Sequence, residues 1–127
     1  MPSRDLADLE PKFRGKVTEY LLFLADVGIS VIVTCTYRSS EEQDKLYAQG
    51  RTDPGKIVTY ACGGQSLHNC TLEGKPASKA VDLVFGTRKK VYWSGPWWLL
   101  GMISKYFGLA WGGDWKHKDN PHFESKV

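Results

Sequence analysis

Apolar residues recur at intervals of three and four through the first 26 positions, a spacing that places them on one face of a helix. These residues are Leu6, Leu9, Phe13, Val17, Tyr20, Leu21 and Leu24. Pro11 lies inside the pattern, where a proline removes a backbone hydrogen bond and clashes with the preceding turn. We therefore expect a short first helix and a longer one from about residue 11, with Ser3 capping the start and Gly28 following the end.

The next segments predict a strand, a helix and a long loop. Residues 30–37 are mostly β-branched and predict a strand, which we expect to be central in its sheet. Ser39, followed three residues later by Glu42, forms a capping-box pattern and predicts a helix that ends before Gly50. Residues 50–76 are rich in Gly, Pro, Thr, Asn and Lys without periodicity, which indicates an unusually long loop. Loops of this length in small domains tend to be functional.

Short strand patterns flank one helical pattern in the second half of the chain. Residues 80–85 alternate apolar side chains around Asp82 and predict a strand. Residues 96–107 carry apolar side chains at helical spacing after a proline, which predicts a helix. Segments 109–111 and 122–124 are short candidate strands on either side of a turn rich in Gly and Asp.

Length and composition indicate one domain, residues 1–127. A chain of 127 residues has no room for two domains of ordinary size. Its 42% hydrophobic residues, with five tryptophans, can form a core without disulfides, which excludes disordered and fibrous proteins. The net charge of +3 suits an anionic partner without implying nucleic acid. No apolar stretch is long enough for a membrane helix.

The N-terminus and the cysteines indicate where in the cell the protein is made. Charged residues stand within the first five positions, where a secretory signal needs an apolar stretch, so we expect cytoplasmic synthesis without a signal peptide. Cys35, Cys62 and Cys70 are an odd count, which leaves at least one free thiol in a monomer. Cys62 and Cys70 could pair, but a cytosolic origin favours reduced thiols.

Three polar residues are candidates for a metal site. His68 and His122 stand in polar segments, and Asp82 lies between them on the strand face of Ala80 and Val84. If that face is covered, the carboxylate needs a paired base or a metal ion. Two imidazoles and one carboxylate are a common Zn²⁺ ligand set that leaves the fourth position open for water. The alternative is that these are ordinary surface and loop residues.

Six motifs follow one another along most of the chain. They are Tyr37-Arg38-Ser39 with Glu42-Gln43, Pro54 to Thr59, Gly64 to Asn69, Ala80 to Leu83, Trp111 to Trp115, and Asp119 to Glu124. In this order they resemble the zinc peptidases of the VanY and L-alanyl-D-glutamate endopeptidase group. The resemblance implies an α+β fold, a small antiparallel sheet with helices packed beside it, as in D,D-peptidases and hedgehog-like zinc peptidases. It also implies a Zn²⁺-dependent hydrolase of bacterial cell-wall peptide bonds.

The resemblance also implies residue roles. His68, Asp82 and His122 match the metal ligands of the family. Asp119 matches its catalytic acidic residue, which would act first as general base and then as general acid. Arg38 matches an arginine that lines the site and would stabilise the oxyanion or hold a substrate carboxylate.

Further residues have weaker assignments. Gln43 and Ser66 match polar residues that line the cleft and are expected to contact substrate, although Ser66 could equally be a turn hydroxyl. Asp114 could hydrogen-bond a ligand histidine, and His117 is expected in a solvated turn between two lysines. Cys62, Cys70 and His68 together form an alternative structural metal site, but their spacing fits zinc knuckles poorly.

An insertion and an aromatic cluster leave substrate choice open. Thirteen residues lie between His68 and Asp82, more than in close relatives, and the extra segment is roughly Cys70 to Lys79. A looped-out segment is tolerable if Asp82 keeps its strand position. Tyr92, Trp93, Trp97 and Trp98 could stack on sugars, but we expect Trp97 in the core and only Trp93 or Trp98 exposed.

The expected function is hydrolysis of the peptidoglycan stem peptide at the L-Ala–D-Glu bond by a monomeric zinc peptidase. Without a signal peptide or a separate wall-binding domain, the chain resembles a phage endolysin, made in the host cytoplasm and released to the cell wall. A prophage-derived bacterial homologue is equally compatible. The rivals are a D,D-carboxypeptidase or dipeptidase with the same zinc machinery, and a non-catalytic wall-binding protein of the same fold.

Overall fold

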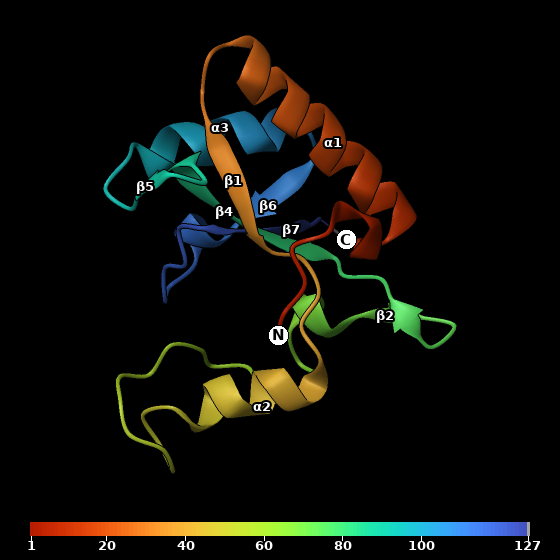
Figure 1. Ribbon diagram of the computed structural model, residues 1–127, viewed down its shortest axis with the longest axis vertical. Coiled ribbons are helices and arrows are strands. Elements are labelled where there is room, and N and C mark those ends of the chain that lie inside the picture. The colour runs from red at the N-terminus through yellow and green to blue at the C-terminus, as the bar shows by residue number, and fades with distance from the viewer. Residues whose placement is uncertain (127) are drawn as a thin grey trace.

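The computed structural model describes residues 1–126 as helices around a small sheet (Figure 1). The α-helices are α1 (Pro11–Asp26), α2 (Ser40–Ala48) and α3 (Trp97–Tyr106). The strands are β1 (Val31–Cys35), β2 (Thr71–Leu72), β3 (Lys75–Pro76), β4 (Ala80–Thr87), β5 (Lys90–Tyr92), β6 (Leu109–Trp111) and β7 (His122–Ser125). Single 3₁₀ turns are η1 (Leu6–Asp8), η2 (Leu67–Asn69) and η3 (Gly112–Asp114).

The main sheet is antiparallel, with β4 at its centre. Its strand order is β1-β4-β7-β6, and β5 pairs with the end of β4. The expectation of a central strand over 30–37 is wrong, because β1 pairs with β4 alone and lies at the edge of the described sheet. Strand β4 is buried along almost its whole length, whereas most of β1 is only half-buried. The α+β fold with a small antiparallel sheet is confirmed.

Two helices and one sheet face form the core. Figure 1 shows α1 and α3 together at one end of the molecule and α2 at the other. The buried residues of α1 pack with those of α3 and the sheet: Phe13, Val17, Tyr20, Leu24, Val81, Leu83, Leu100, Leu109 and Phe123. The Tyr20 hydroxyl donates to the Leu100 carbonyl oxygen at 2.8 Å, so the one polar atom of this buried ring is satisfied. No helix in residues 1–126 is long and apolar enough to cross a membrane.

The ends of the first helices follow the sequence signals, with one exception. Pro11 is the first residue of α1, and η1 precedes it as the expected short helix. Gly28 follows the helix end with φ of 82°, a left-handed conformation that glycine adopts without strain. The cap assigned to Ser3 is wrong, because the Asp5 carboxylate caps η1, the Glu10 carboxylate caps α1, and the Ser3 hydroxyl donates to Asp8 instead. A carboxylate adjacent to the helix start reaches the free N–H groups more directly.

The insertion between His68 and Asp82 forms a hairpin that the sequence did not predict. Strands β2 and β3 pair through a turn at Glu73 and Gly74, both with positive φ. Two such residues in succession are typical of the tight turns that connect hairpin strands. No residue of the insertion lines the cavity described below, so β4 holds Asp82 in its place despite the extra length.

Candidate active site

Strand pairing brings Asp82 and His122 together. Asp82 lies in β4, His122 is the first residue of β7, and the two are opposite each other in the antiparallel register. Side chains opposite each other in such a pair project from the same sheet face. The neighbouring Val81 and Leu83 project from the other face into the core. The alternation that fills the core therefore also turns Asp82 toward His122.

His68 reaches the same place from a loop. It lies in η2, where the Ser66 hydroxyl accepts a hydrogen bond from the His68 backbone N–H at 3.2 Å. The residue is 2% exposed, and its Nδ1 lies 2.8 Å from the backbone carbonyl oxygen of Thr36. This contact orients the ring so that Nε2 faces Asp82.

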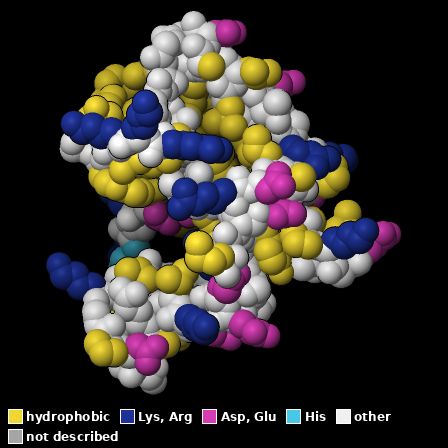
Figure 2. Space-filling view, in the orientation of Figure 1, with side chains coloured by type: hydrophobic (Ala, Val, Ile, Leu, Met, Phe, Trp, Pro, Cys, Tyr) yellow, Lys and Arg dark blue, Asp and Glu magenta, His cyan; other side chains and the backbone are white. Residues whose placement is uncertain are grey.

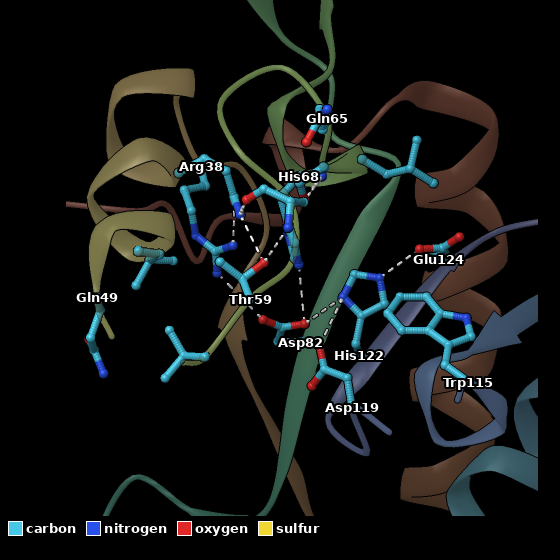
Figure 3. Close-up of a pocket in the computed structure, with 16 residues that line it drawn as sticks. Arg38, Gln49, Thr59, Gln65, His68, Asp82, Trp115, Asp119, His122 and Glu124 are labelled. Carbon is cyan, nitrogen blue, oxygen red and sulfur yellow. Dashed lines mark hydrogen bonds and ion pairs between the residues drawn. The ribbon is translucent and has the colours of Figure 1, made fainter. Parts of the chain in front are cut away.

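The two imidazoles converge on one carboxylate oxygen (Figure 3). His68 Nε2 and His122 Nδ1 each lie 3.2 Å from Asp82 Oδ1. The rings stand edge to face with centroids 5.0 Å apart. Three residues that are distant along the chain therefore meet at one point, as the expected ligand set requires.

Electrostatics at this point favour positive charge. Burial alone would raise the pKa of Asp82, but hydrogen bonds from His122 and His68 outweigh it and hold that pKa well below its ordinary value. Burial would lower the pKa of His68, whereas its contacts with Asp82 and Cys35 raise it to about 10. The pKa of His122 is raised against burial in the same way, through Asp82 and Glu124. The carboxylate therefore stabilises positive charge on the two imidazole rings.

Asp119 lies at the rim of the cluster in a tight turn. Its Oδ2 is 4.0 Å from His122 Nδ1, and its side chain is half exposed. The Asp119 backbone N–H donates to the Gly112 carbonyl oxygen at 2.9 Å, and a Cβ on Gly112 would overlap the Asp119 backbone. Burial raises the pKa of Asp119, and attraction to His122 offsets this only in part. A carboxylate whose pKa is raised accepts a proton more readily than an ordinary aspartate does.

Arg38 approaches Asp82 from its other oxygen. One guanidinium nitrogen lies 3.8 Å from Asp82 Oδ2, and the other terminal nitrogen donates to Gln43 Oε1 at 2.9 Å. Gln43 is 1% exposed and donates through Nε2 to the Ala61 carbonyl oxygen at 2.8 Å. The oxygen and the nitrogen of the Gln43 amide are therefore both hydrogen-bonded, so this side chain orients Arg38 and holds the loop at Ala61.

The residues that the sequence predicts as metal ligands, catalytic groups and substrate contacts line one cavity of about 460 Å³. They are Arg38, Gln43, Ser66, His68, Asp82, Asp119 and His122. Figure 2 shows the surface hollowed between the part that contains α2 and the rest of the molecule, with a histidine side chain beside the hollow. Ser66 belongs to this wall, although its hydroxyl also caps η2.

Sequence reasoning missed two neighbours of the cluster. Glu124 Oε1 lies 2.8 Å from His122 Nε2, and the signal was available, because residues two apart on a strand share a face. Cys35 is opposite Asp82 in the β1–β4 register, and its Sγ lies 3.7 Å from His68 Nδ1. Possible ligand atoms of Cys35, His68 and Asp82 lie within 4.8 Å of one another. Strand pairing creates this proximity, so the local sequence carries no sign of it.

Other expected roles are not supported. Asp114 contacts no ligand histidine; its carboxylate instead forms an ion pair with Lys105 at 2.9 Å, and Glu124 takes the role assigned to it. Cys62 and Cys70 are free thiols and join no metal-ligand group among residues 1–126. The alternative structural metal site therefore does not form. His117 lies in an exposed turn, as expected.

The aromatic cluster divides as predicted. Trp97 packs against Phe85 with ring centroids 4.9 Å apart and borders the core. Trp93 and Trp98 are 58% and 63% exposed. None of the three lines the site cavity, so they have no part in the chemistry there.

Comparison with known proteins identifies the family of this arrangement. The chain is 39% identical over 125 residues to the peptidoglycan L-alanyl-D-glutamate endopeptidase CwlK of Bacillus subtilis strain 168, covering 93% of this chain and 74% of that protein. No protein-family model matches the chain.

Two solved structures share the fold. The L-Ala D-Glu endopeptidase ChiX of Serratia marcescens superposes with a TM-score of 0.63 at 18% identity, covering 99% of this chain and 89% of that one. A mutant of the vancomycin resistance D,D-pentapeptidase VanY from a VanB-type resistance cassette, solved in complex with Zn(II), superposes with a TM-score of 0.65 at 17% identity, covering 92% and 72%. With its fold, its site geometry and its identity to CwlK, the chain belongs to the VanY and L-alanyl-D-glutamate endopeptidase group of zinc peptidases.

Proposed function

We propose that this protein is a Zn²⁺-dependent peptidoglycan peptidase that cleaves the L-Ala–D-Glu bond of the stem peptide. The observation that carries the proposal is the convergence of His68, Asp82 and His122 on one point beside the Asp119 carboxyl group. The activity named for CwlK, at 39% identity, supports the choice of bond.

The donor set fits zinc. We assign His68 Nε2, Asp82 Oδ1 and His122 Nδ1 as ligands, because nitrogen and oxygen donors in this combination are typical of catalytic zinc sites. The remaining nitrogen of each ring contacts the Thr36 carbonyl oxygen or Glu124, the outer partners that metal-binding histidines usually have. Cys35 Sγ contacts His68 at Nδ1, whereas His68 faces Asp82 through Nε2, the nitrogen that we assign as the donor. We therefore assign His122 and not Cys35 as the third ligand.

The chain's own residues would move the proton and position the substrate. When bound, zinc supplies Lewis acidity, which polarises the scissile carbonyl and acidifies water. Asp119 would take a proton from the attacking water and return it to the leaving nitrogen, which its position and raised pKa support. Arg38, held by Gln43, would face the substrate with a fixed cationic fork.

A D,D-carboxypeptidase is the second candidate, and the structural likeness to VanY favours it. The same site would serve either reaction, since both hydrolyse an amide next to a carboxylate-bearing residue. A non-catalytic wall-binding protein is a weaker candidate, because it would have no need for Asp119 beside the metal ligands.

For the biological setting we propose a phage lysis enzyme, with a prophage-derived bacterial enzyme as the alternative. The described residues form the catalytic fold, and a peptidase of this fold could supply the cleavage of the cell wall on which phage lysis depends. Expression in a bacterial host with and without a membrane-permeabilising phage protein tests this setting. Lysis that depends on the second protein supports it, and lysis without that protein contradicts it.

Digestion of purified peptidoglycan followed by mass spectrometry of the stem peptides tests the reaction. A new free amino group on D-Glu is the expected product, and released D-alanine would establish the carboxypeptidase instead. Activity should disappear with a chelator and return with Zn²⁺. Hydrolysis that is indifferent to chelation would contradict the metal assignment.

A further inference from the structure

A second hollow of about 700 Å³ opens beside the site cavity. Its two walls are the segments 57–61 and 115–119. It shares five wall residues with the site cavity: Val58, Thr59, Ala61, Trp115 and Asp119. The two spaces therefore form one continuous groove, with the proposed ligands in the first part and none of them in the second.

Asp119 and Trp115 mark the passage between the two parts. The Trp115 ring lies 4.9 Å from the His122 ring and is 40% exposed, so it faces the cluster on one side and the groove on the other. Figure 3 shows Asp119 and Trp115 on the His122 side of Asp82, and Arg38 on the opposite side. A general acid must lie next to the nitrogen that it protonates. With Asp119 as that acid, the leaving half of the substrate extends toward the second hollow.

The wall of the second hollow carries unpaired positive charge. Lys116 and Lys118 are exposed, and within residues 1–126 no carboxylate lies within 4.0 Å of either ammonium group. The nearby carboxylate of Asp114 is already paired with Lys105. Two free ammonium groups in a hollow that Ile57, Val58 and Trp115 also line suit a ligand with negative charge and some apolar surface.

Apart from Asp119 and the two lysines, the segment 115–119 carries one more polar side chain, and it is already engaged. His117 stacks on Tyr60 across the groove, with ring centroids 4.2 Å apart and planes 22° from parallel. This contact joins the two segments that form the walls. It leaves Lys116 and Lys118 as the cationic groups of this segment that are available to a negatively charged ligand.

We propose that the second hollow binds the leaving half of the substrate, an acidic peptide whose carboxylates pair with Lys116 and Lys118. This inference rests on the proposed function. The stem peptide beyond the scissile bond begins at D-Glu and carries free carboxylates, whereas the half before the bond ends in a glycan. With the leaving half in the second hollow, Arg38 lies beside the other half of the substrate, whose carbonyl oxygen develops the negative charge.

Inhibition by the two separate products tests the direction. One probe is the peptide that begins at D-Glu, and the other is N-acetylmuramyl-L-alanine. In the double variant Lys116→Gln with Lys118→Gln, inhibition by the acidic peptide should weaken about five- to tenfold, as expected for two exposed ion pairs, and inhibition by the muramyl product should not change. Arginine at both positions should restore the inhibition. The control is Lys89→Gln, because Lys89 is exposed and lines neither part of the groove.

Direct binding of the same two probes to the zinc-loaded protein, measured by calorimetry, supplies a readout that does not require turnover. Equal losses for both probes, or a loss for the muramyl product alone, would overturn the proposal; the second result would place the glycan in the hollow. If the wild-type protein cleaves the L-Ala–D-Glu bond but the lysines have no effect, only this inference fails. If the wild-type protein does not cleave that bond, the proposed function fails and takes the inference with it.

Discussion

Glu124 provides a sharp test of the metal site, because it contacts a proposed ligand without being one. Its Oε1 lies 2.8 Å from His122 Nε2, and its side chain is 23% exposed. The substitution Glu124→Gln keeps an oxygen that can accept a hydrogen bond but removes the negative charge. The imidazole should then be a weaker electron donor at Nδ1, the nitrogen that faces Asp82.

The size of the effect follows from the burial of this contact. Loss of an outer partner of a metal-binding histidine costs about 10- to 100-fold in metal affinity, or about 1.4 to 2.7 kcal/mol. Because Glu124 is partly exposed to solvent and the amide retains the hydrogen bond, we expect the lower end, about tenfold weaker zinc binding.

Competition with a chromophoric chelator measures the zinc dissociation constant directly, independent of catalysis. Glu19→Gln is a matched control, because Glu19 is an exposed glutamate on α1 that contacts no part of the site. Circular dichroism of both metal-free variants shows whether the fold is kept. Zinc affinity within about twofold of wild type in a folded Glu124→Gln protein would refute the role of this contact.

Three further changes test the mechanism, the backbone and the charge state. Asp119→Asn should keep bound zinc but lower kcat about 10²- to 10⁴-fold, and metal analysis with steady-state kinetics would check both. Gly112→Ala should lower the free energy of unfolding by about 1–3 kcal/mol, because the added Cβ displaces the Asp119 turn. Gly15→Ala is the control and should raise this free energy slightly, because Gly15 lies in open space on α1. Chemical denaturation measures both. The pKa of His68 is raised from 6.5 to about 10. In the metal-free protein, protonated His68 therefore stabilises the folded state fully below pH 6.5, and this contribution is lost as the pH rises toward 10. Zinc binding, in contrast, requires neutral imidazoles. Thermal melts with and without a chelator should therefore show a larger zinc-dependent rise in Tm at about pH 8 than at about pH 6, and the opposite trend would contradict the ligand assignment.

Local signals in the sequence predicted most of the elements correctly. The break at Pro11, the capping box of Ser39 and Glu42, and the left-handed Gly28 all depend on contacts within a few residues. Such contacts form in much the same way whatever the rest of the chain does, so their sequence signals are dependable. The start of the first helix shows the limit, because Ser3 and Asp5 both carry side chains that can cap a helix and the structure uses Asp5.

Features that depend on strand pairing were beyond the sequence. The edge position of β1 and the approach of Cys35 to His68 each require a partner that local pattern does not specify. Strand order is set by which apolar faces are buried together, a property of the whole core.

The sequence by itself determined the kinds of atoms available at the site: two imidazoles, a strand carboxylate and an acidic residue in a turn, in the order typical of one enzyme family. The tertiary structure alone decided that both imidazoles reach the same oxygen of Asp82. It also decided that Gln43 holds Arg38, and that a groove with two unpaired lysines continues past Asp119. The physical reason is that donor chemistry belongs to each residue, whereas distances between remote residues are fixed only when β4, β7 and the helices pack into one core.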